Sequence, residues 1–574
     1  MKVLLVALNA KFIHSSLSLQ YLKAYCNDLP LEIKIKEFSI NEYISDIMDE
    51  LYLEKPDVLC FSCYIWNINQ ILELCNDYKK IDTNIKIVLG GPEVSYDSHN
   101  MIENNNFIDF IVRGEGEETF KELLNQLYLN QSVTHIKGLT YSIADKIYSN
   151  TDRELVCNLD SLPSPHNIIM PDDNKVIYYE TSRGCPFNCT YCLSSTTKGV
   201  RAFSLDRVKR DLDYLIEKQT KLVKFVDRTF NFNESRAKNI MEHIINRNGN
   251  TKFHFEIQAE LLTKEMIDFL QNVPSDLFDF EIGIQTTFPP ALEAINRKTD
   301  WDKLKENITL LKKNDNIHLH LDLIAGLPYE SYEYFSSSFN MVYELEPDVL
   351  QLGFLKLLKG SEIRIKAKSF GYRFKENPPY QVLANKYITY EQILYLKRIE
   401  ELLNKYFNSH IMRNSLKYIT NNIYNNNAFQ FYEDLADYWE NYKYFNKGHK
   451  RDFYYTILKS FIKDNYIDHD DLLNDIIKFD FLINNKSYNL PDQIIRYNPS
   501  NINEKLSDYI KEEKIDPKLL ATFSGKSIRT LRKYVRLEYF KYNPITYKKF
   551  NEDTSILFEY DPYKKTAFKF SIMK

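Results

Sequence analysis

The sequence predicts an α/β protein in which two strand–helix regions are followed by a mainly helical region. Short apolar runs alternate with amphipathic segments up to about residue 130 and again from about 176 to 358. This rhythm is typical of parallel sheets covered by helices. After about residue 370 the segments become helical and rich in aromatic residues. We therefore expect regions at 1–135, 176–370 and 371–574, with a connector at 136–175.

The first region is predicted to form an open, doubly wound parallel sheet. Its strands are expected at Lys2–Leu8, Val58–Tyr64, Ile85–Leu89 and Phe110–Val112, and its helices at Ser16–Cys26, Ile68–Tyr78 and Glu118–Leu129. Ligands of such sheets bind at the carboxyl ends of the strands. Polar or glycine-containing turns occupy those positions here, and the connector contains a possible hairpin at Leu139–Tyr148.

The second region is predicted to form a partial (β/α) barrel. Its six strands are expected at Val176–Thr181, Leu222–Asp227, Phe253–Ala259, Phe278–Gln285, Ile317–Ala325 and Val349–Leu357. In barrels of this kind, the carboxyl ends of the strands carry the reactive groups.

The third region is predicted to be mainly helical. Its helices are expected at Tyr390–Tyr406, Phe429–Phe445, Phe453–Asn465 and Ser527–Phe540. The segment from Ser524 to Arg536 reads as a basic helix with a serine cap. Arg529, Arg532 and Arg536 of this helix could bind an anionic substrate such as a phosphate or nucleic acid, although a solvated basic face is the more common use of such a pattern.

Composition narrows the class of protein. The 574 residues carry a net charge of −5, which argues against general binding of polyanions, so nucleic acid is a possible but not a favoured partner. No apolar run reaches the length of about 18 residues that a membrane span needs. The first strand runs into polar residues without a cleavage site, so it does not resemble a signal peptide. A cytoplasmic location is expected.

Three of the eight cysteines are closely spaced, and no cysteine follows them. Cys185, Cys189 and Cys192 lie in one short segment directly after the first strand of the second region. Thiolates at this spacing can hold three irons of a cubane cluster and leave the fourth iron open. The alternatives are three buried cysteines or an incomplete zinc site. Cys60 and Cys63 are expected on opposite faces of a strand as buried, inert thiols.

The cysteine segment, Thr181-Ser-Arg-Gly-Cys-Pro-Phe-Asn-Cys-Thr-Tyr-Cys192, resembles the signature of the radical S-adenosylmethionine enzymes. The resemblance implies a [4Fe–4S] cluster whose open iron binds S-adenosylmethionine in a TIM-like partial barrel. The implied contacts of S-adenosylmethionine are Tyr191, Asp227, Glu260, Gln285 and Gly326. Two positions depart from the family: Asp227 replaces a glycine-rich acidic turn, and Gln258-Ala-Glu260 lacks the usual arginine.

The first region resembles the Rossmann-like cobalamin-binding domains, because Ser62-Cys-Tyr64 precedes Gly90-Gly91 by the typical interval. The turn after Arg113 also resembles that of cobalamin-dependent radical enzymes. The implied cobalamin contacts are Asn9, Lys11, His14, Ser62, Tyr64, Gly90, Gly91, Pro92, Glu93, Gly114, Glu115 and Gly116. The usual Asp-x-His-x-x-Gly motif is absent. His14 therefore has three possible roles: cobalt ligand, substrate contact, or hydrogen-bonded loop residue.

Together the two resemblances imply a cobalamin-dependent methyltransferase that acts on an unactivated carbon of an unknown organic substrate. Such an enzyme needs an external electron donor such as flavodoxin or ferredoxin. Three alternatives remain: a non-methylating radical cyclase or oxidoreductase, an RNA-modifying radical enzyme, and a cobalamin-binding sensor with a vestigial cluster. The third region resembles the uncharacterised extension of one subgroup of this family.

Overall fold

The computed structural model describes residues 1–144, 146–168, 172, 174–197, 199–247, 249–487, 489–512, 514–523, 527–564 and 566–573. The chain divides into two compact units. The first comprises Met1–Ser338 and Gln351–Ile393, and the second comprises Phe339–Leu350 and Leu394–Lys574. Among the residues in these described ranges, no helix combines the length and the hydrophobicity that a membrane span requires.

The first unit begins with a seven-stranded sheet in the order β2-β1-β3-β4-β5-β6-β7. Five strands are parallel, and the hairpin β6–β7 adds two antiparallel strands to the edge. The strands are β1 (Lys2–Asn9), β2 (Glu32–Ser39), β3 (Val58–Ser62), β4 (Lys86–Gly90), β5 (Phe110–Val112), β6 (Leu139–Ile143) and β7 (Lys146–Ser149). The main helices are α1 (Leu17–Tyr25), α2 (Ile44–Glu54), α3 (Ile68–Ile81), α4 (Pro92–Ser95), α5 (Ser98–Asn104) and α6 (Glu117–Leu129).

Helices cover both faces of this sheet, as the sequence predicts. Alternate residues of β1 enter two separate cores: Leu4 packs with side chains of α2 and α3, and Leu5 packs with side chains of α1 and α6. Cys63 belongs to the first core and Cys60 to the second, and burial raises the pKa of both thiols. They are inert core residues. The strand order reverses between β1 and β3, where sheets of this type open a ligand crevice.

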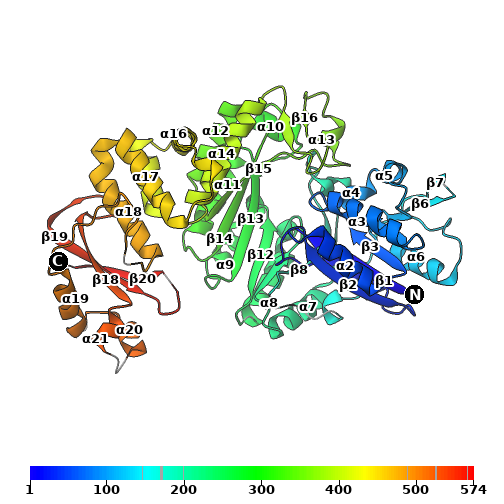
Figure 1. The fold of residues 1–574 in the computed structure, drawn as a ribbon, viewed down its shortest axis with the longest axis horizontal. Helices are drawn as coiled ribbons and strands as arrows, with labels where there is room; N and C mark the ends of the chain where they lie inside the picture. The colour runs from blue at the N-terminus through cyan, green and yellow to red at the C-terminus, as the bar shows by residue number, and fades with distance from the viewer. Residues whose placement is uncertain are drawn as a thin grey trace. The chain divides into compact units, whose positions relative to one another are not determined.

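The second part of the first unit is a six-stranded sheet in the order β15-β14-β13-β12-β11-β8, whose strands lie side by side in Figure 1. These strands are β8 (Ile177–Tyr179), β11 (Leu222–Phe225), β12 (Lys252–Ile257), β13 (Phe278–Gln285), β14 (His318–Ala325) and β15 (Val349–Phe354). The intervening helices are α7 (Leu205–Glu217), α8 (Glu234–Arg247), α9 (Lys264–Leu270), α10 (Pro289–Ala294), α11 (Trp301–Lys312) and α12 (Tyr332–Tyr343). All six predicted barrel strands are present.

The core of the barrel is aromatic. Phe225 of β11 stacks on Phe255 of β12 with ring centroids 4.5 Å apart, and Phe230 contacts both rings. Phe278 of β13 meets Phe255 edge to face. Interlocked aromatic rings restrict the sliding of neighbouring strands, so this core fixes the positions of the strand ends.

The second unit combines helices with a three-stranded antiparallel sheet. It contains α15 (Arg413–Tyr418), α16 (Ala428–Asn441), α17 (Arg451–Asn465), α18 (Asp470–Asn484), β18 (Val535–Tyr542), β19 (Lys549–Tyr560) and β20 (Ala567–Met573), and it takes in most of α14 (Tyr390–Tyr406). Helix α18 is buried without interruption from Leu473 to Leu482. It carries a fully buried ion pair between Asp475 and Lys478, so the helix forms the centre of this unit.

Two sequence expectations need correction. Residues 27–57 contain a strand and a helix, β2 and α2, that the apolar pattern does not reveal, because β2 is an edge strand in which charged residues alternate with isoleucine. The helix expected at Ser527–Phe540 is wrong: a short helix, α21 (Ile528–Leu531), is followed by strand β18. The β-branched and aromatic residues of β18 pair with β19, and residues 524–526 of the expected cap lie outside the described residues.

Candidate functional site

The three clustered cysteines lie on a loop that begins in a hairpin after the first barrel strand. Cys185 ends β9 (Ser182–Cys185), which pairs with β10 (Gly199–Ala202). Cys189 is buried, and the thiol of Cys192 accepts a hydrogen bond from the Ser194 amide at 3.4 Å. Gly184 has a φ of 98°, and a Cβ there would lie 2.1 Å from the carbonyl oxygen of Gly199. Only glycine therefore allows the two strands to meet directly before Cys185.

Asp227, at the end of the second barrel strand, anchors the start of this loop. Its buried carboxylate accepts hydrogen bonds from the Thr181 amide at 2.9 Å, the Thr181 hydroxyl at 2.6 Å and the Ser182 hydroxyl at 2.5 Å. Both of its oxygens are engaged in this way. The observed role of Asp227 is to position the cysteine loop, and its contact with S-adenosylmethionine stays a prediction.

A second anchor comes from the segment after β13. The Thr190 amide donates to the Ile295 carbonyl at 3.0 Å, and the Asn296 side chain donates to the Asn188 carbonyl at 3.0 Å. The guanidinium of Arg297 lies 4.0 Å from the Cys189 sulfur and donates to the Gln258 side chain at 3.0 Å. The sequence alone suggests no role for Arg297. Its guanidinium lies beside Gln258. Gln258 belongs to the Gln258-Ala-Glu260 segment, which lacks the arginine that is usual in the family.

The cysteine loop fits a [4Fe–4S] cluster. Its donor set is three thiols on one loop, which is the set that iron–sulfur clusters use. Among the described residues, no group of three His, Cys, Asp or Glu side chains converges on a single metal ion. In a cluster of this kind, each thiolate binds a separate iron. The zinc alternative would require convergent ligands.

The other residues expected at S-adenosylmethionine lie at the strand ends of the same barrel. Gln285 has a φ of 72°, and its side chain lies over Gly283, where a Cβ would meet it at 2.2 Å. Glu260 accepts from Gln258 at 2.6 Å through one oxygen, while its other oxygen is buried and has no hydrogen-bond partner in the part of the chain that the structure describes. Gly326 has a φ of 89°, and Tyr191 is part of the cysteine loop. Their contacts with S-adenosylmethionine stay predictions.

The first sheet offers a slot at the ends of β3 and β4. The hydroxyl of Ser62 is buried there and has no hydrogen-bond partner among the described residues, although buried hydroxyls normally have one. Gly91 adjoins it with a φ of 111°, and a Cβ at this position would lie 2.6 Å from the Cys63 carbonyl oxygen. A buried hydroxyl that can still form a hydrogen bond, beside a glycine without a side chain, fits a bound group in the slot. The nucleotide of cobalamin would be such a group.

Replacing Gly91 with alanine is expected to lower cobalamin retention at least tenfold, because the added methyl group collides with backbone and displaces the turn. Cobalamin retained by the reconstituted protein after gel filtration, measured from its absorbance, tests this. Gly249→Ala is the matched control, since no atom of the described residues, its chain neighbours aside, lies within 4 Å of a Cβ there. Equal retention by the two variants would contradict the assignment of the slot.

The loop after β1 connects the two parts of the first unit. Asn9 donates to the His14 carbonyl at 3.0 Å, and the His14 ring nitrogen Nδ1 lies 2.6 Å from the Tyr178 hydroxyl of β8. Burial, together with Lys11 and Lys224, lowers the pKa of His14. His14 is thus a hydrogen-bonded residue between the loop and the barrel strand, and Lys11 is exposed.

The remaining residues expected at cobalamin surround the same strand ends. Tyr64 stacks on Trp66 with centroids 4.4 Å apart. Pro92 begins α4. The buried carboxylate of Glu93 accepts a hydrogen bond from the Tyr380 hydroxyl and lies 3.4 Å from the Lys359 ammonium. The interactions of Glu93 are therefore protein contacts.

The turn from Gly114 to Glu117 is tied to the cysteine hairpin. Glu115 forms an ion pair with Arg201 of β10 at 2.7 Å, and Glu117 forms one with Arg183 of β9 at 2.6 Å. Gly114 has a φ of 72° and open space around it, and Gly116 packs near Leu22. The two carboxylates thus join the first sheet to the strands that present Cys185. The sequence shows the acidic turn but not its partners.

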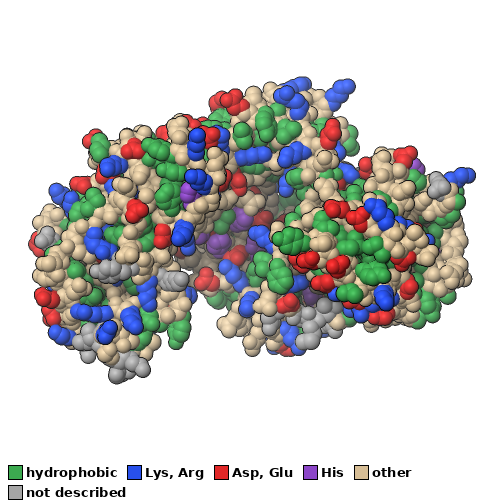
Figure 2. Space-filling view, in the orientation of Figure 1, with side chains coloured by type: hydrophobic (Ala, Val, Ile, Leu, Met, Phe, Trp, Pro, Cys, Tyr) green, Lys and Arg blue, Asp and Glu red, His purple; other side chains and the backbone are tan. Residues whose placement is uncertain are grey.

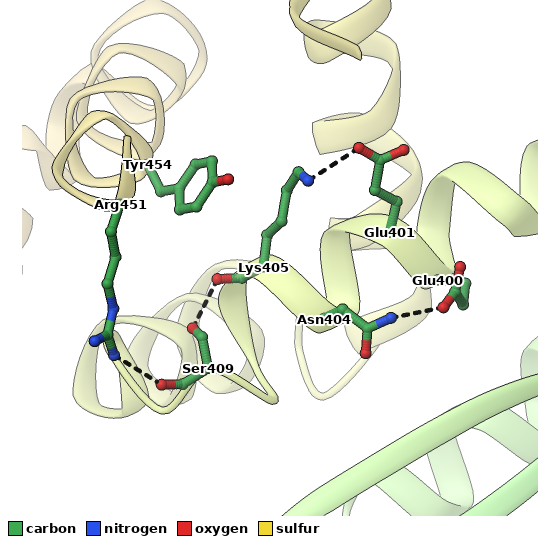
Figure 3. A pocket seen from close by; sticks show the side chains of 7 residues that line it. All are labelled: Glu400, Glu401, Asn404, Lys405, Ser409, Arg451 and Tyr454. Carbon is green, nitrogen blue, oxygen red and sulfur yellow. Dashed lines mark hydrogen bonds and ion pairs between the residues drawn. The ribbon is translucent and has the colours of Figure 1, made fainter. Parts of the chain in front are cut away.

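A separate pocket of about 480 Å³ lies in the second unit (Figure 3). Its polar side chains bind one another: Lys405 pairs with Glu401 at 3.0 Å, Asn404 donates to Glu400 at 2.6 Å, and Arg451 donates to the Ser409 carbonyl at 3.1 Å. The pocket therefore presents few unengaged groups to a ligand.

Three family models match the chain. Residues 3–124 match the B12 binding domain, residues 179–342 match the radical SAM superfamily, and residues 368–558 match a domain family of unknown function, DUF4080. An uncharacterized methyltransferase of Pyrococcus horikoshii is 27% identical over 383 residues, which are 64% of this chain and 82% of that protein. The cobalamin-dependent radical SAM methyltransferase TokK of Streptomyces tokunonensis is 25% identical over 320 residues, which are 50% of this chain and 45% of TokK.

Solved structures share the fold. The cobalamin-dependent S-adenosylmethionine radical enzyme OxsB, with aqua-cobalamin and S-adenosylmethionine bound, aligns with a TM-score of 0.59 at 15% identity. The alignment covers 92% of this chain and 82% of OxsB. The radical S-adenosylmethionine methyltransferase TsrM of Kitasatospora setae aligns with a TM-score of 0.55 at 16% identity, covering 66% of this chain and 78% of TsrM.

The matched models coincide with the two places where the structure fits cofactors. The B12 binding model covers the Ser62–Gly91 slot, and the radical SAM model covers the cysteine loop and its anchors. The chain therefore belongs to the radical S-adenosylmethionine enzymes that carry a cobalamin-binding domain, and its cofactors are a [4Fe–4S] cluster, S-adenosylmethionine and cobalamin.

Proposed function

We propose that this protein methylates an unactivated carbon of an organic substrate. The observation that carries the proposal is the joining of the sheet that contains the cobalamin slot to the cysteine hairpin through Glu115, Glu117 and their arginines. These buried or half-buried ion pairs support a fixed relation between the two cofactor sites. The named methyltransferases among the relatives add support.

Each group of residues has a distinct part in this proposal. Cys185, Cys189 and Cys192 hold the cluster, and Asp227 and Arg297 keep their loop in place. Ser62 and Gly91 hold cobalamin. When bound, the cofactors supply a carbon-centred radical and a transferable methyl group, while the protein supplies position and electrostatics. Reduction of the cluster would come from a small electron-transfer protein such as flavodoxin or ferredoxin.

Product analysis tests methylation. With a chemical reductant and substrate, the reconstituted enzyme is expected to form S-adenosylhomocysteine and 5′-deoxyadenosine in equal amounts, because one S-adenosylmethionine gives the methyl group and another gives the radical. Formation of 5′-deoxyadenosine alone would contradict methylation. It would favour the second candidate, a radical cyclase, since anaerobic magnesium-protoporphyrin IX monomethyl ester cyclase of Cereibacter sphaeroides is 24% identical over 54% of this chain.

Replacing Cys192 with alanine is expected to abolish the cluster absorbance and to lower 5′-deoxyadenosine formation by at least a hundredfold, since a two-thiolate loop cannot hold the cubane. Cys157→Ala is the matched control, because Cys157 is exposed and lies outside the loop. Iron and sulfide content per chain provides a measure independent of activity. A full cluster in the Cys192 variant would refute the ligand assignment and support a vestigial site.

A further inference from the structure

The two faces of the barrel sheet have different chemistry. Buried apolar residues alternate with half-buried polar residues along β12, β13 and β14. Sheets made only of parallel strands are usually covered on both sides and read as nearly continuous apolar runs. The alternation here marks one face whose side chains are less buried than those of the other. That face, called the polar face below, consists of Tyr178, Lys224, Lys252, His254, Glu256, Asp279, Glu281, His318, His320 and Asp322.

Strand register brings these side chains into rows. Lys224 lies between Tyr178 and His254, and in the next row Glu281 lies between Glu256 and His320. Because side chains at matching positions on one face of a sheet are about 5 Å apart, they can interact. In Figure 2, histidine and charged side chains are visible where the barrel strands lie in Figure 1.

Most of the charges on the polar face are already balanced. Glu281 accepts hydrogen bonds from Lys224 at 3.0 Å and from His254 at 2.9 Å. Burial raises the pKa of Glu281, but these two partners outweigh burial and lower it to about 2. His320 and Asp322 form an ion pair at 3.1 Å. These five groups can orient a substrate without carrying an unbalanced charge.

Glu256 differs from its neighbours. Its half-buried carboxyl group has neither a hydrogen bond nor an ion pair within the part of the chain that the structure describes, and it lies in register with the carboxylate of Glu281. Burial raises its pKa; the nearby charges of Arg228 and Lys224 offset part of this rise, and that of Glu281 adds to it. An unpaired carboxyl group beside another carboxylate favours a partner that donates hydrogen bonds or carries positive charge.

The polar face extends from the barrel strand ends to the loop that carries His14. The next row after Glu256, Glu281 and His320 contains Gly283 and Asp322. It lies two residues further along the strands, which is about 7 Å closer to their ends. At the other edge, Tyr178 contacts His14 from the loop of the cobalamin-binding domain. A molecule on this face would therefore lie between the barrel strand ends and the His14 loop of the cobalamin-binding domain.

The charge of the polar face narrows the class of molecule that it accepts. Four carboxyl groups, those of Asp279, Glu256, Glu281 and Asp322, accompany the side chains of Lys224 and Lys252. A surface that binds a nucleic acid carries an excess of basic groups. A surface that binds a hydrocarbon is predominantly apolar. Neither description fits this face.

We infer that the polar face binds a small polar substrate and that Glu256 determines its specificity by accepting hydrogen bonds from an ammonium or hydroxyl group. The inference rests on the proposed function, since it names the substrate class of the same site. The expected substrates are amines, amino acids or amino sugars, and lipids and RNA are excluded.

Stimulation of S-adenosylmethionine cleavage tests the inference in the full-length reconstituted enzyme. The probes are three defined mixtures: amino acids with amino sugars, fatty acids, and a short RNA. Each is added with a chemical reductant, and 5′-deoxyadenosine is measured relative to the uncoupled rate of the same preparation. Stimulation by the first mixture alone is expected. Stimulation by fatty acids or RNA instead, or no stimulation by the first mixture, would overturn the inference.

Variants then test Glu256 itself. For the stimulating component, Glu256→Gln is expected to raise the half-saturating concentration about tenfold or more, because a charge-assisted hydrogen bond is lost, and Glu256→Asp is expected to restore part of the affinity. The control is Glu306→Gln, an exposed position on α11. An unchanged half-saturating concentration in Glu256→Gln would overturn the role of this residue. Absence of uncoupled cleavage in the unaltered enzyme would instead count against the proposed function.

Discussion

The Asp227→Ala variant is expected to lose about 3–5 kcal/mol of unfolding free energy and most of its cluster. Asp227 accepts three hydrogen bonds from Thr181 and Ser182. Its removal leaves buried donors without acceptors at the base of the cysteine loop. The loop would then sample conformations in which its thiols no longer match a cubane.

Iron content and the midpoint of denaturant unfolding measure the two effects. Asp227→Asn is the informative intermediate, because its oxygen can still accept from the hydroxyl groups while its amide nitrogen opposes the Thr181 amide. The Asp227→Asn variant should fall between the Asp227→Ala variant and the unaltered chain in both measurements. Asp268→Ala, at an exposed position of α9, serves as the control. Full cluster content in Asp227→Ala would show that the loop keeps its shape without this anchor.

The Glu330→Gln variant is expected to remove a large pH dependence of stability. The Glu330 carboxyl group is 1% exposed and contacts the hydroxyls of Thr286 and Ser338. Burial raises the pKa of Glu330 to about 8 despite these two hydrogen bonds. The stability that Glu330 contributes is thus complete below its pKa in the unfolded chain, which is about 4.5. It is lost as the pH rises through its pKa in the folded chain, which is about 8. The loss is up to about 5 kcal/mol.

Denaturant unfolding at pH 5, 6.5 and 8 measures this dependence. The unaltered chain should lose stability steadily over this interval, and Glu330→Gln, which cannot ionise, should show a flatter profile. Glu391→Gln, at an exposed position of α14, should leave the profile of the unaltered chain in place. Parallel profiles for the Glu330 variant and the unaltered chain would mean that Glu330 does not titrate with this shift.

Features that depend on local pattern could be predicted from the sequence. The six barrel strands, the cysteine triad and the opposite burial of Cys60 and Cys63 follow from spacing and periodicity alone, and the structure has all of them. The acidic turn that contains Glu115 and Glu117 is also visible as a motif. Their partners are not, because Glu115 and Arg201 are 86 positions apart in the chain, and side-chain pairing at that distance depends on the assembled fold.

The alternating pattern of the polar face is present in the sequence, but it can be interpreted only once the strand topology is known. His318-x-His320-x-Asp322 and Lys252-x-His254-x-Glu256 alternate with apolar residues, which by itself also fits a solvated antiparallel sheet. Only the parallel order of the strands makes the alternation unusual. The strand at Val535–Tyr542 illustrates the opposite problem, since pairing with β19 overrides a pattern that reads as helix.

The contact between Glu93 and Tyr380 has a consequence for synthesis. These residues are 287 positions apart. At a translation rate of 5–20 residues per second, Tyr380 leaves the ribosome on the order of half a minute after Glu93. During that interval the carboxylate beside the Gly91 turn lacks its hydroxyl partner. The first sheet can thus form early, but this strand end reaches its final state only after the barrel has been synthesised. Complete assembly of the cobalamin slot is therefore a late step in the folding of each chain.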